Sequence, residues 1–129
     1  MTSRRRIGSG GPWEAGTGYS RAIAVGDSCW VAGTTDAGPD GRSAHPGDAG
    51  AQARAAFEII GRALAEAGFA LTDVVRTRMF LTDLADSGAV GAIHGEIFGD
   101  IRPAATMVAV AGLIDPSLLV EIEVDARRG

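Results

Sequence analysis

The chain has 129 residues, of which 46% are hydrophobic, and its formal net charge is −4. This length fits one domain with a substantial core, and the apolar runs are too short to span a membrane. The negative charge argues against nucleic acid as the main partner. All twelve basic residues are arginine, which excludes a lysine Schiff base and a lysine-bearing phosphate loop.

Residues 1–12 are expected to be a loosely ordered segment. Arg4, Arg5 and Arg6 are followed by glycine-rich sequence rather than by the apolar stretch of a signal peptide. We therefore expect a cytoplasmic protein whose three N-terminal arginines are solvated at a frayed terminus.

The single cysteine and the two histidines lack the spacing of a metal site. Cys29 lies in an apolar run and fits a small core residue, and without a second cysteine it cannot form an internal disulfide. Neither His45 nor His94 has another His or a Cys close by in the sequence, so we expect no metal.

The first half of the chain predicts a hairpin, a loop and a helix. Residues 21–25 and 28–33 are β-type runs joined by Gly-Asp. The stretch DAGPDGRSAHPGDAG predicts an exposed loop because turn-forming residues crowd there. From the N-cap candidate Asp48 to the stop at Gly68, apolar residues recur every three or four positions. These are Ala53, Ala56, Phe57, Ile60, Leu64 and Ala67.

The second half begins with a strand and a helix. Residues 73–84 alternate as in a strand, which puts Arg76 and Arg78 on one face. The helix expected over residues 85–98 carries His94 on its apolar stripe.

Two more strands are predicted at the end, over residues 104–113 and 118–126. The second alternates apolar residues with Glu121, Glu123 and Asp125. The order of elements predicts an α+β single domain over residues 1–129, with two helices on one side of a mixed sheet.

Five segments occur together in order: YSRAI, VAGTT, AQARAAFEIIGRALAEAG, RPAATMVAV and VEIEVDARR. They resemble the Rid (reactive intermediate deaminase, YjgF-like) superfamily over nearly the whole chain. The resemblance implies a chorismate-mutase-like fold with a six-stranded sheet, and a homotrimeric barrel with three ligand clefts between subunits. Its better-known members hydrolyse short-lived enamines and imines to a keto acid and ammonia, with no metal or bound cofactor.

The resemblance also implies cleft residues. Tyr19 matches a tyrosine near the start, Gly33 a glycine that offers its N–H, and Glu121 a glutamate that holds or activates water.

Other cleft positions depart from the family pattern. Deaminating members have an arginine after Pro-Ala that grips the substrate carboxylate, whereas this chain has Ala105. Met107 replaces a frequent cysteine, and Gly91 replaces an asparagine on the second helix.

Several of these residues also have a structural interpretation. The acids of the last strand fit a solvated face of the sheet. The Tyr19 hydroxyl could simply close a turn, and Gly33 could serve only the backbone geometry. His94 fits a core histidine, although its pKa suits proton transfer and its helix borders the family's cleft.

The roles of three arginines stay open. Arg76 and Arg78 fit salt bridges to the acidic last strand or a subunit interface. Arg102 precedes Pro103, which favours an extended lead-in to the strand. We interpret Arg102 as a surface or interface arginine that pairs with an acid such as Asp100, and less readily as a displaced ligand contact.

Two functions follow as hypotheses. The first is a homotrimer that binds a small metabolite and hydrolyses an enamine or imine, with Glu121 and a water. Without the arginine, the substrate either lacks a carboxylate or is held by other cations. The alternative is a non-catalytic trimer that binds a ligand or a protein. Trimerisation is also expected because residues 105–112 are apolar on both faces and helices can cover only one.

Overall fold

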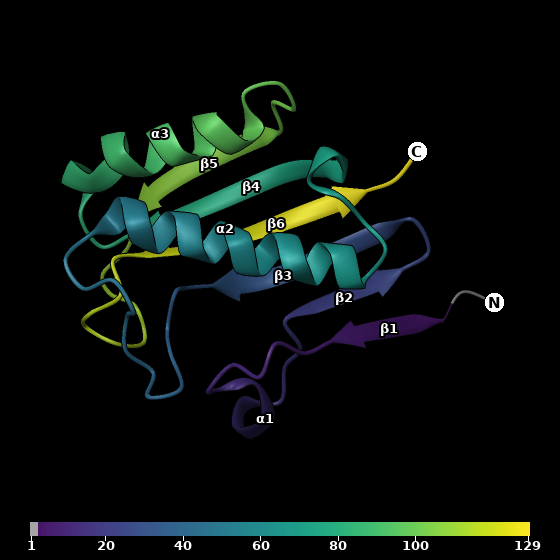
Figure 1. Cartoon of the computed structure of the whole chain (residues 1–129), viewed down its shortest axis with the longest axis horizontal. Coiled ribbons are helices and arrows are strands. Elements are labelled where there is room, and N and C mark those ends of the chain that lie inside the picture. The colour runs from purple at the N-terminus through teal and green to yellow at the C-terminus, as the bar shows by residue number, and fades with distance from the viewer. Residues whose placement is uncertain (1–2) are drawn as a thin grey trace.

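Six strands form one mixed sheet in the order β1-β2-β3-β6-β4-β5 (Figure 1). Neighbouring strands are antiparallel except for β4 and β5, which are parallel. The strands are β1 (Arg4–Ile7), β2 (Ala22–Val25), β3 (Ser28–Thr34), β4 (Val74–Leu81), β5 (Ala104–Ala109) and β6 (Val120–Arg127). This computed structural model describes residues 3–129, which make up a single domain.

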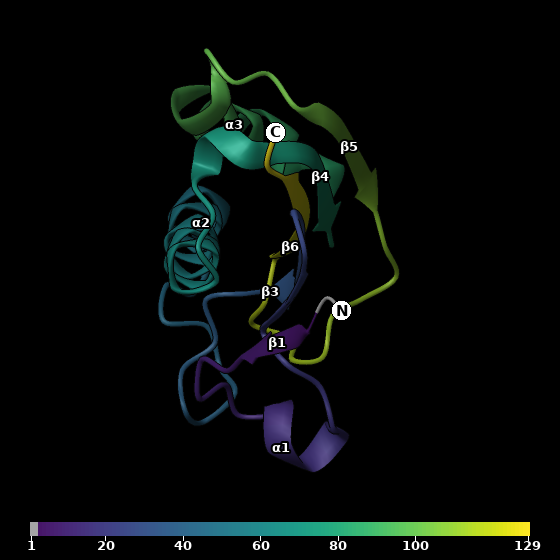
Figure 2. The ribbon, with the colours of Figure 1, turned by 90° about the vertical axis from the view of Figure 1, so that its right-hand side faces the viewer.

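Two helices, α2 (Ala49–Glu66) and α3 (Ser87–Phe98), cover one face of the sheet. Figure 2 shows both on the same side, with the other face left open in the single chain. The predicted layer arrangement is therefore confirmed. Short 3₁₀ turns at Leu71–Asp73 and Leu84–Asp86 precede β4 and α3. None of the helices within residues 3–129 combines the length and apolarity that a membrane crossing requires.

Helix α2 carries the core. Asp48 caps it by accepting a hydrogen bond from the Ala51 N–H at 3.0 Å, and its predicted apolar face is buried throughout. The ring of Phe57 packs edge-on against Phe98 of α3, with centroids 5.4 Å apart. Cys29 is fully buried in the same core, as predicted.

The N-terminal segment differs from its prediction. Met1 and Thr2 lie outside the described residues, but Arg4–Ile7 form the edge strand β1 rather than a frayed terminus, because β2 supplies an antiparallel partner. The Arg5 guanidinium also donates to the carbonyls of Glu66 and Ala67 at the end of α2. A four-residue helix, α1 (Glu14–Thr17), was not predicted.

The extended backbone conformation predicted for Arg102 was wrong. Its φ is +54°, the single positive value at a non-glycine among residues 3–129, so it does not form an extended lead-in. Its N–H instead donates to the Phe98 carbonyl at 2.8 Å and closes the end of α3. The expected ion pair with Asp100 is absent from the described residues.

Candidate active site

A cavity of about 370 Å³ opens where β3 ends beside the N-terminal segment. Its lining includes Tyr19, Gly33 and Glu121, so three of the candidate residues come together. We call these three the Glu121 cluster. Arg21, which the sequence analysis did not single out, also lines this cavity.

Gly33 lies in a β-bulge that brings it against Glu121. Between the pairs Val31–Val124 and Thr34–Ile122, two residues of β3 oppose one residue of β6, which is the pattern of a bulge. A Cβ on Gly33 would overlap the Glu121 carboxylate and lie 2.9 Å from its Cδ. Since the φ of Gly33 is not positive, glycine here permits the close approach of the Glu121 side chain rather than a special backbone conformation.

The Glu121 carboxylate differs from the other acids of β6. Arg78 pairs with Glu123 at 3.3 Å and with Asp125 at 3.5 Å, which is the first of the two alternatives that the sequence left open for Arg78. Arg76 forms no such bridge within residues 3–129. Glu121 has neither a salt bridge nor a side-chain hydrogen bond among the described residues, so its oxygens are available in the cavity.

Burial shifts the pKa of the Glu121 carboxyl. Desolvation raises the pKa of its carboxyl above the ordinary 4.5, and the nearby charge of Glu123 adds to this rise. The positive charge of Arg21 acts in the opposite direction. A carboxyl whose pKa moves toward neutrality is better suited to general acid–base work than an ordinary surface glutamate.

A second group of candidates lies apart from the cavity. Ala105 and Met107 of β5 pair with Thr77 and Met79 of β4, and the methyl end of Met107 lies 4.0 Å from the place where a Cβ on Gly91 would be. We call Gly91, Ala105 and Met107 the Ala105 cluster.

The two clusters face opposite sides of the sheet. Thr77 contacts α3, so its partner Ala105 is on the helix-covered face. Glu121 pairs with Phe80, whose side chain alternates to the open face. Strand β4 also separates β5 from β6, which puts their backbones roughly 10 Å apart. A single chain therefore does not bring Ala105 beside Gly33 and Glu121.

His94 occupies a packed position on α3. Its Nε2 is 2.8 Å from Thr77 Oγ1, and its ring packs against Phe57 and Phe98. Burial lowers the pKa of His94 below 6.5, so the neutral form is favoured. His94 does not line the cavity that contains the Glu121 cluster.

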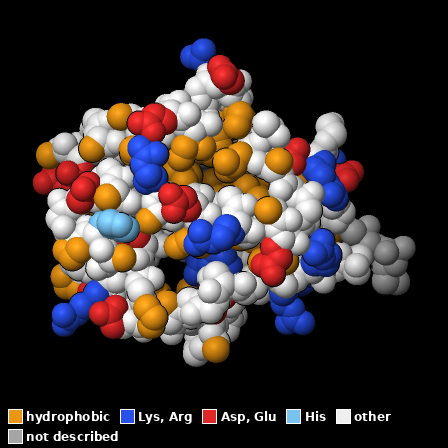
Figure 3. Space-filling model, in the orientation of Figure 1, with side chains coloured by type: hydrophobic (Ala, Val, Ile, Leu, Met, Phe, Trp, Pro, Cys, Tyr) orange, Lys and Arg blue, Asp and Glu red, His pale blue; other side chains and the backbone are white. Residues whose placement is uncertain are grey.

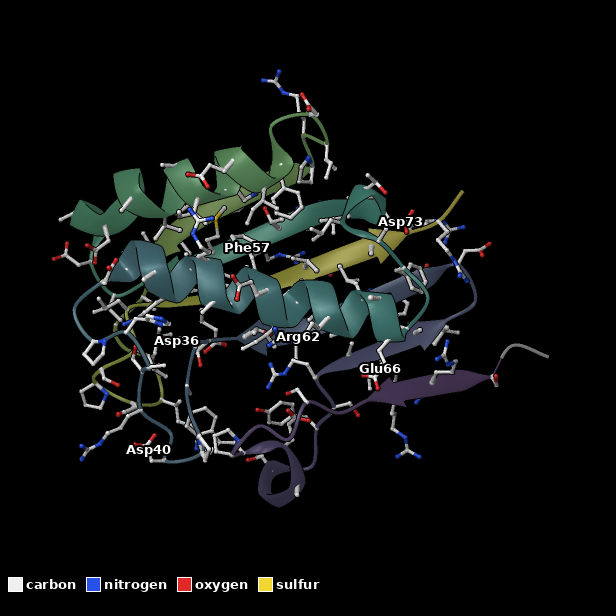
Figure 4. All side chains as sticks on the ribbon, viewed as in Figure 1. Asp36, Asp40, Phe57, Arg62, Glu66 and Asp73 are labelled. Atoms are coloured by element: carbon white, nitrogen blue, oxygen red, sulfur yellow. The ribbon has the colours of Figure 1, made fainter. Side chains whose placement is uncertain are left out.

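Two loops that contribute residues to the cavity lining are linked by hydrogen bonds to one buried glutamine. Gln52 of α2 donates to the carbonyls of His45 and Ser117 and accepts from the Leu119 N–H, at 2.8 to 3.1 Å. The first loop is also tied by Asp36, which Figure 4 marks after β3, and which accepts hydrogen bonds from Ser43 and His45. These ties hold the walls without using any residue of the Glu121 cluster.

The described residues 3–129 contain no group of three or more His, Cys, Asp and Glu that is suited to a metal ion. Polar groups in the cavity lining include the half-buried Glu121 carboxyl, the Tyr19 phenol and the Arg21 guanidinium.

Comparison with known proteins gives the family. The model of the family described as endoribonuclease L-PSP matches residues 12–128. The chain belongs to this YjgF/Rid family. An uncharacterized protein of Streptomyces coelicolor is 44% identical, and the match covers 100% of this chain and 97% of that protein. The 3-aminoacrylate deaminase RutC of Acinetobacter baylyi is 36% identical over 81% of this chain and 82% of RutC.

Solved structures agree with this membership. A YjgF/YER057c/UK114 family protein from Mycobacterium tuberculosis superposes with a TM-score of 0.88 at 46% identity, covering 98% of this chain and 100% of that one. As a Rid-family chain, the protein keeps a cavity at the Glu121 cluster, but it carries alanine where the resemblance led us to expect the arginine of deaminating members.

Proposed function

We propose that the chain forms a cytoplasmic homotrimer that hydrolyses small imines or enamines without a cofactor, in clefts between subunits. The observation that carries this proposal is the Glu121 carboxylate, half-buried, without a partner in the described residues, and facing one cavity with the Tyr19 hydroxyl. RutC, a relative, is named a deaminase that acts on 3-aminoacrylate.

The proposed reaction adds water across a C=N bond. Glu121 takes a proton from the water as the water oxygen attacks the imine carbon, and then gives that proton to the nitrogen, which forms a carbinolamine. Glu121 next takes the proton of the carbinolamine hydroxyl and passes it to the nitrogen as the C–N bond breaks, so that the products are a carbonyl compound and ammonia and Glu121 is returned to its ionised form. Tyr19 and the backbone at Gly33 orient the substrate through hydrogen bonds.

The separation of the two clusters supports the homotrimer. The positions that match the family's cleft lie on opposite faces of one sheet, so a site that contains both needs a second chain. The open face also leaves Trp30 45% and Val108 40% exposed, and large apolar side chains on an uncovered sheet face favour burial by a neighbour.

The charges of the site favour an uncharged substrate. The positive charge of Arg21 is shared between two carboxylates, those of Glu14 and Glu121. The Ala105 cluster contains no positively charged residue. A substrate carboxylate bound there would lack a free cationic partner, which costs several kcal/mol. We therefore propose imines and enamines without a carboxylate as substrates, rather than α-imino acids.

Cleavage of RNA receives less support, although the family model is described as an endoribonuclease. On the face covered by the helices, arginines are interspersed with Asp and Glu (Figure 3), and the acids of β6 face the opposite side. A nucleic-acid site would instead show a basic patch.

Ammonia release from a panel of freshly generated imines, enamines and enamides tests the proposal. We expect turnover of uncharged members by the wild-type protein, and none by Glu121→Gln with an unchanged circular dichroism spectrum. The surface variant Arg54→Gln is the control. Absence of turnover with every compound, in a folded protein, would favour the alternative of a non-catalytic binding trimer.

A further inference from the structure

Arg21 is a buried arginine whose whole donor capacity is used inside the chain. It is 6% exposed and precedes β2. Its Nε donates to Ser9 Oγ, Nη1 to the Gly33 carbonyl and Thr34 Oγ1, and Nη2 to the Tyr19 hydroxyl oxygen and Glu14, at 2.6 to 3.5 Å. A guanidinium has five N–H groups and no acceptor, so this set is complete.

The bond between Arg21 and Tyr19 fixes the role of the phenol. Arginine can only donate, so the Tyr19 oxygen is the acceptor at 3.2 Å. The phenol has one proton of its own, and that proton must point to another partner. Because Tyr19 lines the cavity, the available partner is a ligand or water, and Tyr19 acts as a donor toward it.

Arg21 also supplies positive charge to the cavity, whose lining within residues 3–129 includes no other basic residue. Its charge opposes the effect of burial on Glu121, while Glu123 acts in the same direction as burial. Glu14, 3.5 Å from Nη2, offsets part of that charge. The carboxylate of Glu14 is itself held by Ser9 and Gly11.

We propose that Arg21 is a positioning residue: it binds no ligand, directs the Tyr19 proton into the cavity, and places a positive charge in the lining that it shares with Glu121. The use of these interactions in catalysis rests on the proposed function. The competing role, in which Arg21 replaces the absent arginine and grips a substrate carboxylate, would require a free N–H pair. All five N–H groups already have acceptors in the chain.

The experiment uses two spectroscopic readouts on the full chain. Carbon-13 NMR of labelled glutamate follows the titration of the Glu121 carboxyl, assigned with Glu121→Gln. The Raman doublet of the phenol reports whether its oxygen accepts a hydrogen bond, and Tyr19 is the only tyrosine. Neither readout needs a substrate, so failure of the proposed function and failure of this inference are distinguishable.

The variants separate charge from geometry. Arg21→Met removes the charge and every donor, so we expect Glu121 to titrate at higher pH and the Tyr19 doublet to lose its acceptor signature. Arg21→Lys keeps the charge, and Glu121 should titrate close to the wild type. The matched control Arg54→Gln, which breaks an exposed pair with Glu96, should change neither readout.

A second variant covers the case in which Arg21→Met does not fold. Glu14→Gln removes the negative charge beside Arg21, so Glu121 should titrate at lower pH than in the wild type. If both single variants fold, an unchanged Glu121 titration in Glu14→Gln and in Arg21→Met would overturn the inference. If Arg21→Met does not fold, an unchanged Glu121 titration in Glu14→Gln would overturn it. A wild-type doublet without an acceptor signature would also overturn it.

Discussion

Substitution of Gly33 by alanine should displace the Glu121 carboxylate within the cavity. The added Cβ would overlap the Glu121 carboxylate and lie 2.9 Å from Cδ and 3.3 Å from Cγ. The glutamate must therefore leave its position, since the bulge fixes the backbone of β3 between its register points on β6.

The expected cost follows from two opposing effects. Inserting a methyl group into a packed contact costs about 1–3 kcal/mol. Replacing glycine where the backbone conformation is ordinary regains about 0.4–1 kcal/mol by restricting the unfolded chain. We expect the free energy of unfolding to fall by up to about 2.5 kcal/mol, and ligand binding and turnover to be lost while the fold is kept.

Urea denaturation measures this change, with Gly61→Ala as the matched control. Gly61 lies on α2 with no atom within 4 Å of its Cβ position, so alanine there should stabilise by about 0.5–1 kcal/mol. In a Glu121→Ala background, the cost of Gly33→Ala should disappear because the overlapping atoms are gone. Equal stability of Gly33→Ala and Gly61→Ala, with wild-type turnover in both, would show that the contact between Gly33 and Glu121 constrains neither stability nor function.

Four further predictions concern stability and specificity. Because burial raises the pKa of Glu121 above 4.5, its ionised form destabilises the fold, so Glu121→Gln should raise the calorimetric Tm at neutral pH and not below pH 4.5. Gln52→Leu should lower the urea-derived stability by about 3 kcal/mol, since three buried bonds are lost. The lowered pKa of His94 predicts a loss of stability as pH falls below 6.5, which His94→Phe should remove. Ala105→Arg should gain ammonia release from α-imino acids, a bidentate grip contributing about 1.5–3 kcal/mol. Arg102→Ala should keep ligand binding and change the stability by about 0.5 kcal/mol or less, because Arg102 is exposed and forms no ion pair among the described residues.

Periodicity was enough to predict most of the layer arrangement. Apolar residues recur every three or four positions in α2 and at every second position in β6, so that each element has one apolar face that packs in the core. Both elements and their buried faces were therefore predictable. Strand β1 was not predictable, because RRRI has no alternating apolar pattern and its pairing depends on β2.

The site was predictable only in part. The resemblance identified Tyr19, Gly33 and Glu121, which share one cavity. It did not reveal the separation of Ala105 from them, because β6 inserts between β3 and β4 out of chain order, which leaves β4 between β6 and β5. Arg21 was missed since an arginine is expected at the surface. Its spacing of two from Tyr19, typical of one strand face, was the signal that could have found it.

Subunit complementation tests whether each site unites the Glu121 cluster of one chain with the Ala105 cluster of another. Two variants of the proposed trimer are prepared, Glu121→Gln and the cleft-filling Ala105→Trp, each expected to be inactive toward the imines proposed as substrates. Mixed under conditions that exchange subunits, with hybrid trimers verified by native mass spectrometry, they should regain turnover, because a hybrid contains a site with neither substitution. Hybrid trimers that remain as inactive as their parents would contradict the account.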